Sequence, residues 1–163
     1  MKNPIQYKQI VDHGIRAAGC IILLLLICVC GWESHASADC ADIKITTKQQ
    51  VVSKGDTVYV MVTVTSTTAM SGFEGFFTYD NTVLQFQTGG SVVYGNDDAF
   101  QISDIDRSST ATKLKYSIKF KARKAGDTEI ALTGPYHVFG ESTSTKLSAS
   151  YNSLVLVVKD REK

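Results

Sequence analysis

The sequence predicts an all-β domain, a sandwich or a barrel, on the strength of two observations. Short apolar runs alternate with polar residues, most clearly over residues 57–65 and 113–123, and a period of two is typical of a half-buried strand. These runs are separated by Gly, Asp, Asn, Ser and Thr, and no stretch after residue 41 has a helical period of useful length. Many short strands divided by turn residues favour two packed sheets or one closed sheet.

Turn residues divide the chain into the expected strands. Asp80 and Asn81 can hydrogen-bond to their own backbone and end the strand that precedes them. Residues 154–158 form a continuous apolar run, which is predicted to be a strand buried on both sides. Residues 83–86 are either a strand or an apolar lid. The other candidate strands cover residues 43–47, 51–52, 57–65, 71–79, 91–94, 100–105, 113–123, 128–132, 136–139 and 146–150.

The first 38 residues are predicted to be a signal peptide. Basic residues precede an apolar run over residues 17–30, and Ala36-Ser37-Ala38 has the A-x-A pattern of a cleavage site. As a helix this run would rise about 21 Å, which is short of the roughly 30 Å hydrocarbon core. We therefore expect a secreted or cell-surface domain over residues 39–163, without membrane contact after cleavage. An uncleaved signal anchor is the alternative.

The composition of residues 39–163 excludes several classes of function. Basic and acidic residues are equal in number there, which does not favour nucleic-acid binding. Cys40 and His137 are the only Cys and His, so an internal disulfide and a His-based zinc site are excluded. A Ser-His-Asp triad would have to use His137, which sits beside an apolar residue on a predicted strand. We expect this His to be structural.

Four acidic residues lie close together and could suit a hard cation. Their spacing lacks the alternating ligands and the closing Glu of a calcium loop, and a small sandwich without Trp offers no evident cleft for a glycosidase carboxylate pair. We therefore expect no enzyme activity, no metal site and no cofactor. The residues interpreted as solvated loop acids are Asp97, Asp98, Asp104 and Asp106.

The predicted strand over residues 71–79 carries an aromatic residue on the side that is expected to face solvent. Phe73, Phe77 and Tyr79 fall on one side, whereas Phe76 falls on the other side next to Glu74. An outward Phe flanked by charge has the composition of an interface centre. The alternative is a covered Phe76, under the loop after residue 140 or under residues 83–86.

The strand over residues 113–123 carries a row of basic residues on its polar side. Such a row can bind a partner, or it can simply keep the sheet soluble and prevent edge pairing. We predict that this strand lies beside the strand of Glu74, where the opposite charges could also pair with each other. The row comprises Lys113, Lys115, Lys119, Lys121 and Arg123, with Ser117 between them.

Three segments together resemble the cohesin domain of bacterial cellulosome scaffoldins. They are Gly-Asp-Thr-Val at 55–58 leading into a Val-rich strand, the aromatic strand and Tyr-Asp-x-x-Val-Leu turn at 73–84, and residues 118–126 running toward Leu-Thr-Gly at 132–134. The resemblance extends over residues 42–159, and the region of Phe73 is more similar to the type II branch. The segment between residues 94 and 112 is short, so a strand of the family is expected to be missing or displaced.

The resemblance implies a jelly-roll β-sandwich of about nine strands that binds a dockerin, a paired-helix module that carries its own calcium. Such a module catalyses nothing and belongs to a cellulosome or a cell-surface polysaccharide-degrading assembly. Its docking face is one sheet, which includes the outer side of the strand of Glu74 and of a neighbour that holds Lys115. The implied partner-binding residues are Gly72, Glu74, Phe76, Thr78, Lys115, Ser117 and Lys119.

Two other functions remain open. A carbohydrate-binding module can share this kind of sandwich and would bind polysaccharide through aromatic side chains, for which Tyr59, Tyr94, Tyr136 and Tyr151 would replace the missing Trp. A structural envelope or adhesin domain would contact another copy or a wall protein through Cys40.

Overall fold

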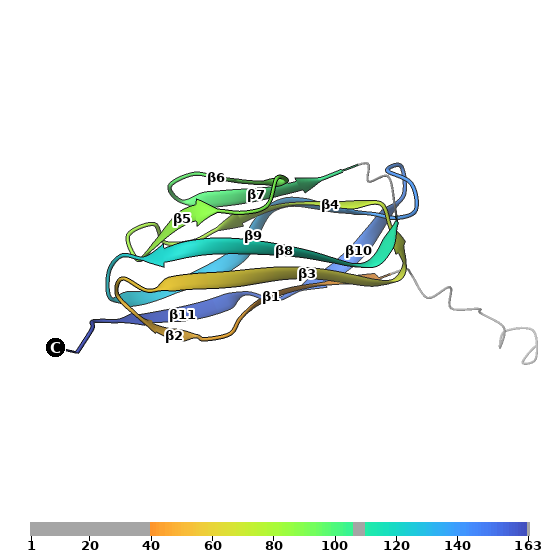
Figure 1. The fold of residues 1–163 in the computed structure, drawn as a ribbon. Coiled ribbons are helices and arrows are strands. Elements are labelled where there is room, and N and C mark those ends of the chain that lie inside the picture. Colours follow the sequence, from red (N-terminus) through yellow and green to blue (C-terminus); the bar gives the residue numbers. More distant parts are fainter. Residues whose placement is uncertain (1–39, 106–109, 163) are drawn as a thin grey trace, which may run out of the picture. The chain divides into compact units, whose positions relative to one another are not determined.

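The computed structural model describes residues 40–105 and 110–162, and the predicted signal peptide lies outside these residues (Figure 1). The all-β prediction is confirmed, because the described residues form strands and no helix, and so none that could cross a membrane. The described residues form eleven strands where about nine were expected. They are β1 (Cys40–Thr47), β2 (Val51–Ser53), β3 (Thr57–Met70), β4 (Gly72–Thr78), β5 (Leu84–Thr88), β6 (Val93–Gly95), β7 (Ala99–Asp104), β8 (Ala111–Ala122), β9 (Gly126–Phe139), β10 (Lys146–Tyr151) and β11 (Leu154–Lys159).

The strands form one hydrogen-bonded path that folds into two layers. The order is β5-β8-β3-β1-β10-β9-β4-β7-β6, with β11 paired to β9 and β2. One layer holds β5, β8, β3 and β1, the other holds β9, β4, β7 and β6, and β10 joins them by pairing parallel to β1 and antiparallel to β9 (Figure 1). The two ends of the path approach each other, since a Cβ on Gly95 of β6 would lie 2.5 Å from the ring of Phe86 of β5. The sheet is therefore nearly closed into a barrel.

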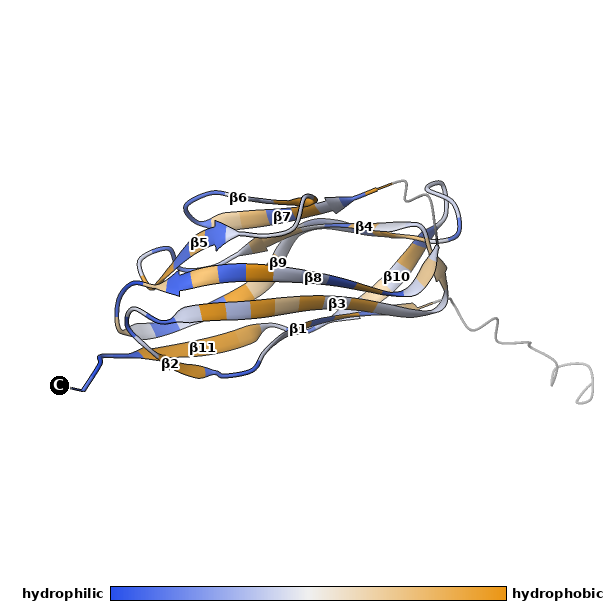
Figure 2. Cartoon of the chain, viewed as in Figure 1, coloured by the Kyte–Doolittle hydropathy of each residue, from blue (hydrophilic) through white to orange (hydrophobic). Residues whose placement is uncertain are grey.

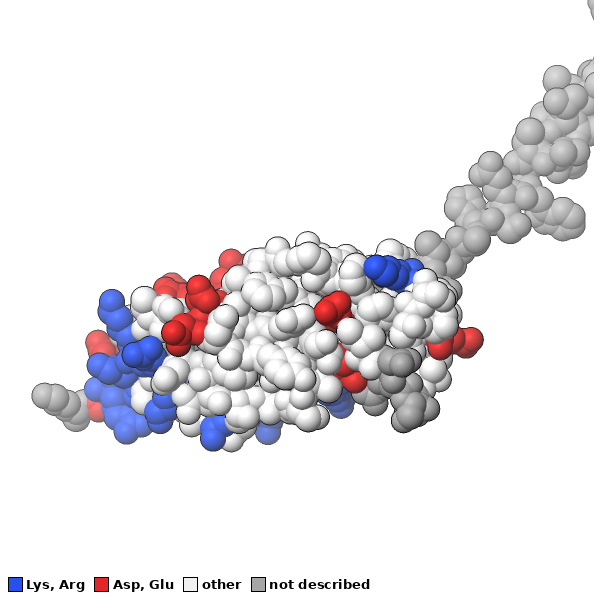
Figure 3. All heavy atoms as spheres, turned by 90° about the horizontal axis from the view of Figure 1, so that it is seen from above, with Lys and Arg blue, Asp and Glu red and all other residues white. Residues whose placement is uncertain are grey.

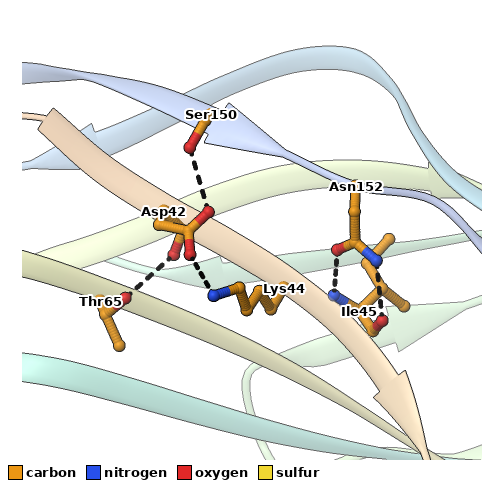
Figure 4. A network of polar contacts seen from close by, with 6 residues as sticks. All are labelled: Asp42, Lys44, Ile45, Thr65, Ser150 and Asn152. Atoms are coloured by element: carbon orange, nitrogen blue, oxygen red, sulfur yellow. Dashed lines mark hydrogen bonds and ion pairs between the residues drawn. The ribbon is translucent and has the colours of Figure 1, made fainter.

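A polar network holds the parallel joint between β1 and β10 (Figure 4). The Asp42 carboxylate accepts hydrogen bonds from Lys44 Nζ at 2.9 Å and from Ser150 Oγ at 3.0 Å. The Asn152 side chain accepts from the Ile45 N–H at 2.8 Å and donates to the Ile45 carbonyl at 3.1 Å. The two Asn152 bonds satisfy backbone groups of β1, and the network lies where the sheet passes from one layer to the other.

The core lies between the layers and is filled by the inward side of each alternating strand (Figure 2). The ring of Phe77 stacks on Phe100 with centroids 4.8 Å apart, and the Phe120 ring meets Phe100 edge-on at 5.9 Å. Burial of each such ring contributes roughly 1.5–3 kcal/mol. Aromatic residues of both layers thus hold the sandwich together.

Two sequence predictions about the strands are revised. The run at residues 154–158 is not buried on both sides, because β11 is covered on one face only and Val155 is 52% exposed on the other. Residues 83–86 do not cover Phe76, since β5 pairs with β8 in the opposite layer. The short segment between residues 94 and 112 contributes β7, which pairs with both β4 and β6.

Candidate functional site

The two strands that were expected to form one docking face are not neighbours. β4 lies between β7 and β9, whereas β8 lies between β3 and β5 in the other layer. Glu74 therefore cannot pair with Lys115 across adjacent strands. The prediction was wrong because a period of two fixes the side on which a residue lies but says nothing about the neighbouring strand.

Three of the predicted residues on β4 do share an outer face. Phe76 is 38% exposed, and Glu74 and Thr78, two positions to either side, are half-buried. Gly72 does not join them, because it is buried and a Cβ at its position would collide with the carbonyl oxygen of Asp104. A partner on this face would meet side chains from Glu74 to Thr78.

A bulge in β9 makes room for Phe76. In the pairing of β4 with β9, Gly75 lies opposite Tyr136 and Phe77 lies opposite Leu132. Between these two pairs β4 has one residue, Phe76, whereas β9 has three. The middle one is Gly134, where a Cβ would lie 2.8 Å from the Cβ of Phe76. A glycine at this point allows the close approach of the Phe76 side chain and so sets where the ring lies.

Residues of β6 and β7 complete the surroundings of Phe76. Gln101 of β7 lies opposite both Phe76 and Tyr94 of β6, and its Nε2 donates to Glu74 Oε1 at 3.1 Å. Phe76, Tyr94 and Gln101 line an open hollow of about 190 Å³. We call the outer side of β9, β4, β7 and β6 around this hollow the Phe76 face. The sequence does not predict a role for Gln101, because its position opposite Phe76 depends on the pairing of two strands that are separate in the sequence.

The charge distribution differs between the two sides of the molecule. Figure 3 looks from above, onto the side where β6, β7 and β4 lie at the top of Figure 1, and shows a mainly uncharged surface with some acidic groups. Lys and Arg gather along one margin and at one end of this view. None of the residues that line the hollow beside Phe76 is a Lys or Arg.

Lys115, Ser117 and Lys119 point outward from the other layer. They lie opposite Thr63, Met61 and Tyr59 of β3, and we call this outer side of β8, β3 and β1 the lysine face. Lys115 and Ser117 are exposed, and Lys119 is half-buried. The predicted partner-binding residues are thus divided between two faces of the sandwich.

The described acidic residues of the predicted loop cluster, Asp97, Asp98 and Asp104, lie in different surroundings. Within residues 40–105 and 110–162 no group of three or more His, Cys, Asp or Glu side chains could hold a metal ion. Asp97 and Asp98 are exposed loop acids as predicted, and Asp106 lies outside the described residues. Asp104 corrects the prediction, because it is buried and its Oδ2 accepts a hydrogen bond from Tyr116 at 2.8 Å. Its role is to join β7 to β8 inside the barrel.

The four tyrosines proposed for sugar binding do not form one strip. Tyr59 lies on the lysine face and Tyr94 on the Phe76 face. Tyr136 and Tyr151 form an edge-on pair elsewhere, with ring centroids 5.6 Å apart. The single planar aromatic strip that would favour a carbohydrate-binding module is therefore not made by these tyrosines.

The comparisons with known proteins agree with this architecture. No protein-family model matches the chain, and no curated protein matches it significantly. Among solved structures, the sixth cohesin of Acetivibrio cellulolyticus scaffoldin B, in complex with a mutant dockerin, is 20% identical with a TM-score of 0.57 over 73% of this chain and 99% of that one. The chain has the fold of cohesin domains.

The cohesin fold is found in other settings as well. A type II cohesin from the cellulosome of Acetivibrio cellulolyticus is 15% identical with a TM-score of 0.55, over 71% of this chain and 94% of that one. A non-cellulosomal cohesin from the archaeon Archaeoglobus fulgidus is 13% identical with a TM-score of 0.57, over 73% of this chain and 91% of that one. At such identities the likeness establishes the fold, and the greater similarity to type II stays a prediction.

Proposed function

We propose that this protein is a non-catalytic binding module that docks a dockerin-type partner through the Phe76 face. The observation that carries the proposal is Phe76 itself, an outward aromatic held in place on one sheet of a cohesin fold. The partner would carry the calcium, and this chain would need no metal or cofactor. The setting would be extracellular, in a cellulosome or another cell-surface assembly that degrades polysaccharide.

The chemistry around Phe76 suits the centre of a protein interface. Interfaces favour aromatic anchors where charge is sparse, and surround them with polar groups that exclude water. Here the Glu74–Gln101 hydrogen bond lies on one side of Phe76. On the other side, Thr133 Oγ1 donates to Thr78 Oγ1 at 3.2 Å. The hollow beside the ring can receive an apolar side chain of the partner.

The structure changes which residues this proposal uses. Glu74, Phe76 and Thr78 keep the role expected from the sequence, and Tyr94 and Gln101 join them. Gly72 would contribute only its buried backbone. Residues on the outer side of the opposite layer would not contact a partner seated on Phe76, and we assign no docking role to Lys115, Ser117 and Lys119.

Calorimetric titration with dockerin modules from the source genome tests the function. We expect binding when the dockerin is loaded with calcium and loss of binding with a chelator, since the partner's fold depends on the metal. The same protein should not bind cellulose or xylan that is free of uronic acid side groups. Binding to these neutral polysaccharides, with no binding to any loaded dockerin, would contradict the proposal and favour a carbohydrate-binding module.

A further inference from the structure

Lysine side chains form a regular row along β8. Lys113, Lys115, Lys119 and Lys121 occupy alternate outward positions, with Ser117 between the two pairs. A strand rises about 3.3 Å per residue, so neighbouring positions in this row are about 6.6 Å apart. Lys44 of β1 extends the row sideways, because it lies opposite Thr63, which in turn lies opposite Lys115.

Carboxylates of the described residues neutralise this row only in part, at its end, where Lys121 interacts electrostatically with the Asp56 carboxylate. On the lysine face only Lys44 forms an ion pair with a described acid, at 2.9 Å from Asp42. Aligned like charges repel one another and weaken a fold, whereas solubility is better served by mixed charges. The formal net charge of the whole chain is only +1. The row of lysines therefore reflects an uneven distribution of charge over the surface and not an excess of basic residues in the protein.

An exposed aromatic residue stands within this basic surface. Tyr59 is 58% exposed and lies directly opposite Lys119 on the neighbouring strand. Tyr59 also borders a hollow of about 270 Å³ whose other lining residues include Thr47, Lys48 and Gln49. Phosphate groups bind lysine without any aromatic surface. A sugar ring that carries a carboxylate uses both features, because the ring can stack on the tyrosine while the carboxylate pairs with the lysine.

We propose that the lysine face binds an extended acidic polysaccharide that contains uronic acid units. The chain of the polysaccharide would run along β8, with its carboxylates near the lysines and one sugar ring on Tyr59. This site is independent of the proposed docking function. Because it lies on the opposite layer from Phe76, one molecule could hold a protein partner and a polysaccharide together.

The test is titration of the full chain with polygalacturonate of defined length at low ionic strength. Lys115→Gln/Lys119→Gln should weaken this binding about tenfold, since each exposed charge contact contributes up to about 1 kcal/mol. The matched control is Lys146→Gln/Lys159→Gln, which removes two exposed lysines of β10 and β11 and should change the affinity less than about twofold.

Tyr59→Ala separates the sugar from the charge. It should weaken polygalacturonate binding several-fold and leave the binding of inorganic polyphosphate unchanged. Absence of polygalacturonate binding, or an equal loss for the two lysine pairs, would overturn the site. Polyphosphate binding as tight as that of polygalacturonate, with Tyr59→Ala without effect on either, would overturn the assignment to a sugar acid.

Discussion

The two outer faces of this sandwich are both formed by strands with alternating inward and outward residues, but the outward side chains differ in chemical character. On β4 the outward positions carry Glu74, Phe76 and Thr78, and Phe76 packs against a glycine bulge of the neighbouring strand. On β8 the outward positions carry lysines opposite Thr63 and Tyr59. Within the described residues both layers expose their outer side, so each side can acquire its own chemistry: we propose that one binds a protein partner and the other an anionic chain.

The largest difference between the faces should appear at Phe76. Phe76→Ala should weaken dockerin binding by about 2 kcal/mol or more, because a central aromatic anchor is removed. The thermal midpoint of this variant should stay near that of the wild type, since Phe76 is 38% exposed and lies outside the core. Lys115→Ala/Lys119→Ala is the control and should alter dockerin binding by less than about 0.5 kcal/mol. Unchanged docking by Phe76→Ala together with a large loss of stability would place Phe76 in the core.

Two tyrosines of equal exposure give a matched comparison of the faces. Tyr94 is 60% exposed beside Phe76, and Tyr59 is 58% exposed beside Lys119. Tyr94→Ala should cost about 1–2 kcal/mol of dockerin binding, measured by calorimetry, because Tyr94 forms a wall of the hollow. Tyr59→Ala should leave dockerin binding unchanged. A larger loss of dockerin binding for Tyr59→Ala than for Tyr94→Ala would contradict the proposal and place the docking site on the lysine face.

The glycine bulge provides a test in which no side chain of the proposed contact surface is replaced. Gly134→Ala would put a Cβ 2.8 Å from the Cβ of Phe76, so the Phe76 side chain would have to move. We expect about 1 kcal/mol of lost dockerin affinity, at the lower end of the cost of overpacking. Gly90→Ala is the control, because a Cβ there meets nothing within 4 Å. Equal affinities of the two variants would show that the position of Phe76 is not critical.

The smallest expected effect concerns acid stability at the edge of the lysine face. The hydrogen bond from Lys44 lowers the pKa of Asp42 below its ordinary value of 3.8. A carboxyl whose pKa is lower in the folded state than in the unfolded state stabilises the fold. This stabilisation is complete at pH values above the ordinary pKa, and it is lost as the pH falls through the folded-state pKa. Asp42→Asn should therefore lower stability by about 0.5 kcal/mol near neutral pH. It should also reduce the acid dependence of the thermal midpoint, unlike the exposed control Asp160→Asn.

Local features of the fold were predictable from the sequence, and the neighbourhood of each strand was not. Alternation placed Phe77 inside and Phe76 outside, and it placed the lysines of β8 on one side. It could not show that β5 leaves β4 to pair with β8, because hydrogen-bonded register depends on residues far apart in the chain. For the same reason Gln101 was missed, and Asp104 was taken for a loop acid although it is bonded to Tyr116 in the core.

Chemical-shift mapping of the protein bound to a calcium-loaded dockerin tests the central claim most directly. The perturbed amides and side chains should centre on Glu74, Phe76, Tyr94 and Gln101, while those of Tyr59, Lys115 and Lys119 stay at their unbound positions. Perturbations centred on the lysine face, with the surroundings of Phe76 unchanged, would contradict the account.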